Sequence, residues 1–362
     1  MQNFKIILLL FLFAFFIDKA FSQKKQVELP GTEVIEFKSA INDRDYVIDV
    51  SLPNSYKDTT KRFPVLYALD GQWSFPEVLS YYGGLNYDGF VPDMIIVGVG
   101  WKDDYINNRD RDFSETYTQS NPNSGGAPKF IDVLKNEVIK LIDSTYRTDK
   151  INNTLRGNSS AGVFALYTLF QEPTLFNRYI IGSPSLENDD SVIFKIEREF
   201  AKKNHELNAK IFFSVGEYEE PLKYVSRLDR FTKQLKASNY KRLEFKSMVV
   251  EETGHGSEGS FGFVRGLQYV FNKPELILNV TVLDSYTGHY AFGPDTATIS
   301  RLGNSLYQQL PWGKIELYAE TPQKFYVKGM PGTIEFKKDG KNKITGFDFT
   351  VGDNKFFVKR ID

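Results

Sequence analysis

The stretch LRGNSSAG at residues 155–162 constrains this chain more than any other part of it. It reads small-x-Ser-x-small, and an apolar pattern with helical spacing follows directly. Such a pattern is typical of a serine on a sharp turn between a strand and a helix, where the residues two before and two after must be small to clear the neighbouring backbone. Gly157 and Ala161 meet that requirement around Ser159.

A serine on such a turn is placed to act as a nucleophile. The start of the following helix directs free N–H groups and the positive end of its dipole at the Ser159 oxygen. The N–H of Ser160 can then donate to an oxyanion. Because glycine and serine are common, the same letters also fit a plain helix cap with close packing. The residues further along the chain therefore decide between a nucleophilic serine and a plain helix cap.

Composition argues against several other functions. A formal net charge of -1 over 362 residues gives no electrostatic reason to expect nucleic acid or an acidic membrane as a partner. With no cysteine, the chain forms neither disulfides nor a thiolate metal site. Three histidines leave little for a zinc centre. We therefore expect no metal and no cofactor.

Residues 1–22 are predicted to be a secretory signal peptide. Lys5 supplies the positive start, residues 6–17 are apolar, and AFS at residues 20–22 fits the small-x-small cleavage rule. A membrane-spanning helix needs about 20 apolar residues, more than this run offers. An uncleaved anchor is the alternative. We expect an exported protein, periplasmic or secreted, with no stable membrane span after cleavage.

Strand and helix patterns alternate over most of the chain. Residues 63–69 and 94–100 are near-continuous apolar runs, as strands buried on both faces of a parallel sheet require. An antiparallel pair is expected at residues 33–37 and 46–52, and a polar loop at residues 101–126. The alternation predicts an α/β fold with a doubly wound, mostly parallel sheet.

The pattern changes near the Lys-Pro pair at residues 273–274. From residue 278 onward strand signals recur at short spacing with no convincing helix, which predicts a small all-β domain. The expected organisation is a signal peptide at residues 1–22, an α/β domain at residues 23–275 and a β domain at residues 276–362.

Three reactive side chains follow predicted strands in a fixed order. Ser159 comes first, a glutamate second and His255 third. In a parallel sheet all strand C-termini lie at one edge, so the three side chains can converge. A histidine can take the serine proton, and an acid can hold the imidazole in its tautomer. The order is that of the α/β-hydrolase arrangement.

Two glutamates compete for the place of the acid. Hydrolases of this topology usually carry it a few residues past the strand end, as Gly-x-x-acid. Counted from Gly216, that position is Glu219, whereas Glu217 follows the glycine directly. We predict Glu219 as the acid that orients His255 and keep Glu217 as the alternative.

At these residues the sequence resembles the esterase D-like branch of α/β hydrolases, which includes enterochelin esterase-like and feruloyl or acetyl esterase-like proteins. The resemblance covers roughly residues 32–271. At the elbow this family usually has His-Ser-x-Gly-Gly, whereas Asn158 and Ala161 stand here. The matching pieces are LYALDGQW at residues 66–73, RDRDF at 109–113, GNSSAG at 157–162, SPSL at 183–186 and GHG at 254–256.

The resemblance implies roles for several residues. Ser159 would be the nucleophile and His255 the base. The loop after residues 70–71 would form half of an oxyanion hole, with the backbone N–H of Gln72 beside that of Ser160. Family members differ most at the acid, and some siderophore esterases work with serine and histidine alone, without an acid. The C-terminal part resembles the small lipocalin-like β domain of some secreted serine hydrolases.

Together these features predict an exported serine esterase that hydrolyses acyl or aryl esters on a carbohydrate or siderophore through an acyl-enzyme on Ser159. Acyl transfer with the same triad is one alternative, and a catalytically silent module that binds glycan is another. Trp73 and Trp101 are expected at the pocket rim, where either indole could stack on a sugar or aryl acid; ordinary core packing is the alternative.

Overall fold

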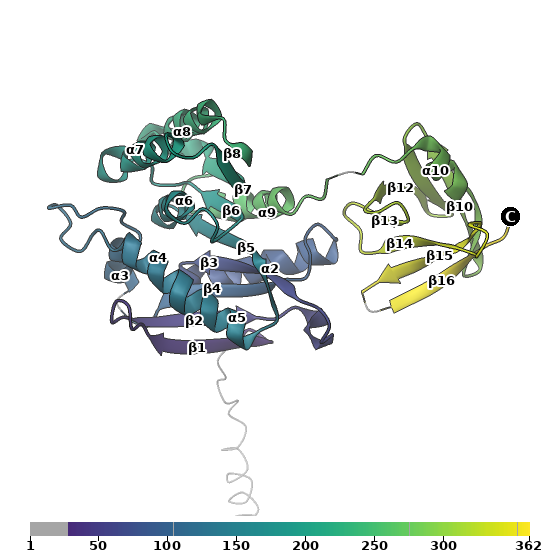
Figure 1. The fold of residues 1–362 in the computed structure, drawn as a ribbon, viewed down its shortest axis with the longest axis horizontal. Coiled ribbons are helices and arrows are strands. Elements are labelled where there is room, and N and C mark those ends of the chain that lie inside the picture. Colours follow the sequence, from purple (N-terminus) through teal and green to yellow (C-terminus); the bar gives the residue numbers. More distant parts are fainter. Residues whose placement is uncertain (1–27, 104, 275, 353) are drawn as a thin grey trace, which may run out of the picture. The chain divides into compact units, whose positions relative to one another are not determined.

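The chain folds into a mixed α/β domain followed by a separate C-terminal β barrel (Figure 1). The computed structural model describes residues 28–103, 105–274, 276–352 and 354–362. The signal peptide predicted at residues 1–22 therefore lies outside the described residues.

Eight strands form the sheet of the α/β domain in the order β1-β2-β4-β3-β5-β6-β7-β8. β1 and β2 pair antiparallel, β2 also runs antiparallel to β4, and the remaining pairs are parallel. The predicted doubly wound sheet with an antiparallel pair at its start is thus confirmed. The strands are β1 (Thr32–Lys38), β2 (Asp45–Ser51), β3 (Phe63–Leu69), β4 (Ile95–Trp101), β5 (Thr148–Asn158), β6 (Arg178–Gly182), β7 (Glu206–Gly216) and β8 (Lys241–Val250).

Helices cover both faces of this sheet because its central strands carry apolar side chains on both sides. On one face α2 and α9 pack against residues such as Leu66 and Phe212. The other face is covered by the helices from α4 to α8. The helices are α2 (Gly71–Tyr87), α3 (Tyr105–Asp112), α4 (Ala127–Val133), the π-helical turn η2 (Leu134–Val138), α5 (Ile139–Thr145), α6 (Ser160–Gln171), α7 (Asn188–Ala201), α8 (Tyr224–Ser238) and α9 (Glu258–Val270), with 3-10 turns η1 (Asn54–Lys57) and η3 (Glu217–Leu222).

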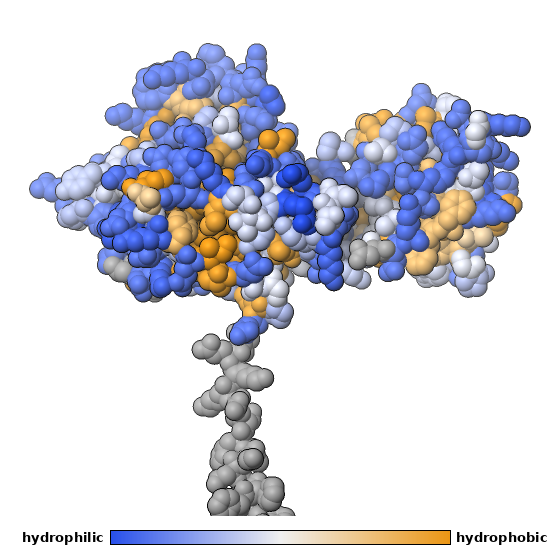
Figure 2. All heavy atoms as spheres, turned by 60° about the horizontal axis from the view of Figure 1, so that its bottom comes forward, coloured by the Kyte–Doolittle hydropathy of each residue, from blue (hydrophilic) through white to orange (hydrophobic). Residues whose placement is uncertain are grey.

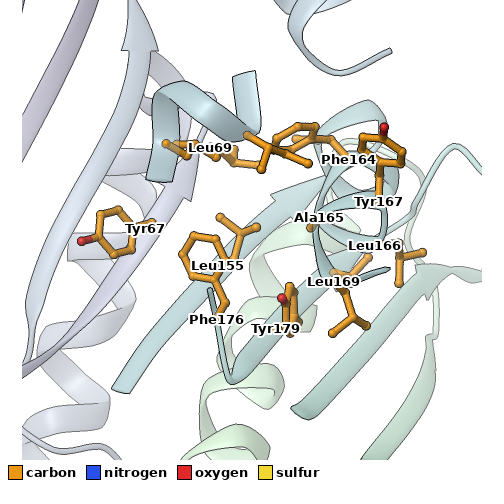
Figure 3. Packing of buried hydrophobic residues seen from close by; sticks show 14 of the residues in the cluster. Tyr67, Leu69, Leu155, Phe164, Ala165, Leu166, Tyr167, Leu169, Phe176 and Tyr179 are labelled. Atoms are coloured by element: carbon orange, nitrogen blue, oxygen red, sulfur yellow. The ribbon is translucent and has the colours of Figure 1, made fainter. Parts of the chain in front are cut away.

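The core beneath the start of α6 is dense and apolar. Figure 3 shows members of this core, among them Leu155 of β5, Phe164 and Leu169 of α6 and Phe176 from the following loop, and all four side chains are buried. Every residue of α6 from Ala161 to Phe170 is buried. Because interiors are packed as tightly as organic crystals, the first turn of α6 is held rigidly at the end of β5.

The surface contrasts with this interior. Figure 2 shows that hydrophilic side chains cover most of the face in view, with smaller apolar areas between them. Some exposed apolar surface is normal for a folded protein. Within the described ranges, no helix is both long and apolar enough to cross a membrane.

A polar loop was expected at residues 101–126, but this stretch contains the helix α3. The helix is anchored through Asp112, whose Oδ2 accepts hydrogen bonds from the Tyr46 hydroxyl and the Trp101 indole, both at 2.8 Å. The polar sequence did not indicate this helix, because contacts with residues distant in sequence hold it in place. Such tertiary contacts routinely override local helix propensity.

The C-terminal domain is an eight-stranded antiparallel barrel, which confirms the predicted all-β domain. The strands pair in chain order, and β16 returns to pair with β9, so the barrel is closed. This up-and-down arrangement of eight strands is the one that lipocalins use. Its strands are β9 (Gly288–Phe292), β10 (Asp295–Leu302), β11 (Ser305–Leu310), β12 (Gly313–Ala319), β13 (Lys324–Tyr326), β14 (Thr333–Lys338), β15 (Ile344–Val351) and β16 (Asn354–Arg360).

One helix precedes the barrel where the sequence indicated none. α10 (Val280–Tyr286) begins after Asn279, whose side chain accepts the Thr281 N–H at 2.9 Å. Its Tyr286 is buried in the barrel core and stacks on Phe336 with ring centroids 4.1 Å apart. The β-branched residues of this segment favour strands, but the cap and the burial of its apolar side outweigh that preference.

Candidate active site

Ser159 occupies the sharp turn between β5 and α6. Its backbone has φ 60° and ψ -121°, a conformation that non-glycine residues rarely adopt. The Ser159 N–H donates to the Gly182 carbonyl at 2.9 Å, and its carbonyl accepts from Gly162 and Val163 of the first turn of α6. Backbone hydrogen bonds from two elements therefore hold the strained turn in place.

Close contacts explain the small residues around this turn. A Cβ atom added to Gly157 would lie 2.3 Å from the Ala161 carbonyl oxygen, and one added to Gly162 would lie 3.1 Å from the Gly182 oxygen. No side chain fits at Gly157 without moving backbone. The structure thus shows the close backbone contact from which the sequence analysis inferred a small residue at position 157.

His255 lies in the loop between β8 and α9, and its Nδ1 is 2.5 Å from Oε2 of Glu219. Glu219 belongs to η3, directly after β7, and only 3% of the residue is exposed. Its other oxygen, Oε1, accepts hydrogen bonds from the Gly216 N–H at 2.7 Å and the Ser183 hydroxyl at 2.5 Å. The carboxylate is fixed by three donors and directed at the imidazole.

The other candidate acid points elsewhere. Glu217 is exposed, and its Oε2 accepts the backbone N–H of Glu252 at 2.9 Å. Of the two glutamates that the sequence offered, Glu219 is therefore the one that contacts His255.

The contact between Glu219 and His255 shifts both ionisation equilibria. The hydrogen bond to Glu219 raises the pKa of His255 above its ordinary value, and this effect exceeds the opposing effect of burial. Burial alone would raise the pKa of Glu219, but the hydrogen bonds from His255, Ser183 and Gly216 together hold that pKa below its ordinary value. The pair thus favours an ionised glutamate.

Ser159 and His255 line one pocket with a volume of about 410 Å³. Trp73, from the first turn of α2, lines the same pocket and is 52% exposed. Two ion pairs complete the wall: Arg109 Nε lies 2.9 Å from Asp70 Oδ1, and Arg156 Nη2 lies 2.6 Å from Glu77 Oε2. The two cations of the wall are therefore each matched by a carboxylate.

The two residues expected to form the oxyanion hole begin helices next to this pocket. Gln72 follows Asp70 and Gly71 at the start of α2, and Ser160 is the first residue of α6. The first N–H groups of a helix have no partner within the helix, so the hydrogen bonds of α2 and α6 themselves do not use these two groups. Neither residue lines the pocket itself; Ser160 instead lines a neighbouring polar pocket of about 240 Å³.

The expectation that Trp101 flanks the pocket is wrong. Trp101 is 5% exposed, and its ring packs against Phe113 and Phe130. Its indole N–H is satisfied by Asp112. The alternative, an ordinary core aromatic, is correct, because β4 is buried over its whole length up to this residue.

Several neighbours of the site escaped the sequence analysis. Ser185 Oγ lies 3.2 Å from Ser159 Oγ and 3.5 Å from the Tyr224 hydroxyl. Tyr224 also packs edge-on against His255, with centroids 5.2 Å apart. The SPSL motif was a signal for Ser185, but only the pairing of β5 with β6 reveals that it meets Ser159.

The sequence of this chain is similar to those of known esterases. The Esterase family, described as "Putative esterase", matches residues 39–257. The ferri-bacillibactin esterase BesA of Bacillus subtilis is 30% identical over 249 residues, which are 64% of this chain and 82% of that protein. The siderophore triacetylfusarinine C esterase of Aspergillus fumigatus is 29% identical over 208 residues, 54% of this chain and 70% of its relative.

Solved structures agree on the fold. The BES protein from Bacillus cereus superposes with a TM-score of 0.61 at 25% identity, covering 70% of this chain and 99% of that one. An IroE-like serine hydrolase from Shewanella oneidensis gives a TM-score of 0.62 at 24% identity, covering 70% and 85%. This chain therefore belongs to the Esterase family, in its enterochelin esterase-like branch, and is an enzyme that hydrolyses carboxylic esters.

Proposed function

We propose that this chain hydrolyses ester bonds of siderophores through an acyl-enzyme formed on Ser159. The observation that carries the proposal is the 2.5 Å contact between His255 and a buried Glu219, in a pocket that His255 shares with Ser159. The names of the two curated relatives, a ferri-bacillibactin esterase and a siderophore triacetylfusarinine C esterase, favour siderophore esters over carbohydrate esters.

Each residue has one role in the proposed reaction. Ser159 Oγ attacks the ester carbonyl carbon while His255 Nε2 takes its proton, and Glu219 stabilises the imidazolium through Nδ1–H. The backbone N–H groups of Gln72 and Ser160 receive the negative oxygen. Collapse of this intermediate releases the alcohol, which leaves with the proton from His255. Water, activated by the same histidine, then frees the acid and regenerates Ser159.

The pocket wall supports an aromatic acyl or alcohol group. Trp73 offers a partly exposed indole face beside Ser159 and His255. Aromatic rings stack on such a face in offset or edge-on geometry. We assign Trp73 to substrate binding on this basis.

Covalent labelling tests whether Ser159 is the nucleophile. A fluorophosphonate probe should label the protein once, and peptide mapping should place the label on Ser159. The Ser160→Ala variant keeps the backbone N–H of residue 160 and should still be labelled, whereas Ser159→Ala should not. No labelling of the folded wild type would favour a silent glycan-binding module.

A substrate panel then separates the remaining candidates. Catecholate, feruloyl and acetyl esters should be compared at equal concentration, with catecholate or other siderophore esters expected to give the highest kcat/KM. Adding a competing alcohol distinguishes hydrolysis from acyl transfer, because a transferase forms a new ester instead of free acid. Equal rates on all esters would argue against siderophore specificity.

Activity should depend on pH through His255. The base must be neutral to accept the Ser159 proton, and the hydrogen bond to Glu219 raises the pKa of His255. The acid limb of kcat/KM should therefore lie above the free-histidine value of about 6.5, with activity lost as pH falls through it. A profile that stays flat down to about pH 5, with the protein folded, would contradict this role.

We also propose that the chain is exported, with residues 1–22 as its signal peptide, and that residues 23–275 carry the catalytic residues. Ser159, Glu219 and His255 all precede the barrel. Removing residues 278–362 should leave a soluble esterase that is somewhat less stable, measurable by thermal unfolding and ester hydrolysis. Complete loss of activity in a folded truncation would assign the barrel a part in the pocket.

A further inference from the structure

Two buried carboxylates lie behind His255 and share one hydroxyl group. Glu219 is 3% exposed and Glu258, the first residue of α9, is 0% exposed. Ser183 Oγ lies 2.5 Å from Glu219 Oε1 and 3.0 Å from Glu258 Oε2. The proposed reaction uses only Glu219, so the second carboxyl group needs an explanation.

The number of hydrogens available between Ser183, Glu219 and Glu258 indicates which carboxyl group is protonated. The Ser183 hydroxyl has one hydrogen to donate. Glu219 already accepts from Gly216 and contacts Nδ1 of His255. Ser183 also lies closer to Glu219 than to Glu258. If Ser183 donates to Glu219, an oxygen lone pair of the hydroxyl faces Glu258. An ionised Glu258 would set lone pair against lone pair at 3.0 Å, whereas a protonated one completes a hydrogen bond.

The surroundings of Glu258 agree with this assignment. Burial raises its pKa, and the negative charge of Glu219 raises it further. The neighbouring hydroxyls of Ser214 and Ser183 and the charge of Arg156 act to lower the pKa of Glu258 but do not reverse the shift. Arg156 is itself paired with Glu77, which weakens its hold on Glu258. A negative charge on Glu258 would also raise the pKa of His255.

The same carboxyl group also contacts the residue before the nucleophile. Asn158 Nδ2 donates to Glu258 Oε2 at 3.2 Å. The packing is tight here, since a Cβ atom on Gly182 would lie 2.5 Å from Asn158 Nδ2 and 3.0 Å from Glu258 Oε2. Glu258 therefore joins the turn that carries Ser159 to the Ser183–Glu219 pair that holds His255.

We propose that Glu258 is a positioning residue that works as a neutral acid, donating its proton to Ser183 while accepting from Asn158. In this state the negative charge of the pair stays on Glu219, which contacts His255, and Glu258 fixes the distance between the nucleophile and its base. The inference rests on the proposed roles of Ser159, His255 and Glu219. Its first test below does not depend on them.

Infrared difference spectroscopy tests the protonation state directly. The wild-type minus Glu258→Gln spectrum at neutral pH should contain the carbonyl stretch of a protonated carboxylic acid. The matched control, Glu217→Gln, removes an exposed glutamate and should remove only a carboxylate band. A carboxylate band lost from Glu258→Gln would overturn the proposal. If that variant does not fold, wild-type protein with ¹³C-labelled glutamate carboxyls serves instead, and absence of any protonated-glutamate band overturns it.

Kinetics of two substitutions test the positioning role. Glu258→Leu removes both hydrogen bonds and should lower kcat by about tenfold or more with little change in KM. Ser183 and Asn158 contact the same oxygen, Oε2, so Glu258→Gln can offer an N–H to Ser183 only by giving up the hydrogen bond from Asn158, and it should recover part of that loss. Above the pKa of Glu258 the wild type should lose activity while Glu258→Gln does not. If Glu258→Gln is as slow as Glu258→Leu, or shares the wild-type alkaline limb, Glu258 does not act as a neutral acid.

Discussion

Replacing Ser159 with alanine is expected to lower kcat/KM by about three orders of magnitude or more. The substitution removes the atom proposed to form the acyl-enzyme, while the proposed oxyanion donors and substrate contacts remain. The fold should survive, because among the described residues the side chain bonds to Ser185, at 3.2 Å, and the backbone hydrogen bonds of the turn do not involve the side chain. The measurement is hydrolysis of an activated ester, with circular dichroism to confirm folding.

The matched control for this experiment is Ser185→Ala. It removes the other hydroxyl of the same hydrogen bond without touching the proposed nucleophile, so its rate should stay far above that of Ser159→Ala. Near wild-type hydrolysis by a folded Ser159→Ala variant would show that another group attacks the ester.

Replacing Glu219 with glutamine is expected to lower kcat by up to about 10⁴. The carboxylate accepts from Nδ1–H of His255 and so leaves the opposite nitrogen free to take the serine proton. A glutamine that turns its N–H₂ group toward Nδ1 would favour the wrong tautomer. The loss should appear in kcat with a saturable substrate, after thermal unfolding has shown that the buried substitution leaves the variant folded.

Glu217→Gln is the control, because Glu217 lies in the same turn but is exposed and contacts a backbone N–H instead of His255. It should cost much less than Glu219→Gln. The opposite ranking would move the acid to Glu217, and equal small effects would indicate a Ser159–His255 dyad.

Much of the fold could be predicted because the strand signals were strong. The apolar runs that became β3 and β4 are buried on both faces, and a parallel sheet leaves few other solutions for such runs. The two missed helices had no such signal. α3 is highly polar and depends on Asp112, and α10 is rich in β-branched residues and depends on its cap and on Tyr286.

Those site residues could be predicted that chain order and turn geometry identify. Counting from Gly216 selected the glutamate that contacts His255, although its catalytic role stays a prediction. Ser183 and Glu258 could not be found in this way, because they meet only when β6, η3 and α9 come together. Trp101 was misplaced because an aromatic residue at the end of a strand looks the same in sequence whether it faces the core or the rim.

The two sheets of this protein also differ in what they offer to a neighbouring chain. An open sheet can recruit a further strand through the unpaired N–H and C=O groups of its edge. The barrel has no edge, since β9 and β16 pair. β8 is an edge strand of the open sheet, and four of its first six residues are charged: Lys241, Arg242, Glu244 and Lys246. A strand adding there would have to strip water from these groups. Closure of the barrel and the charges along β8 thus disfavour strand addition at these two places.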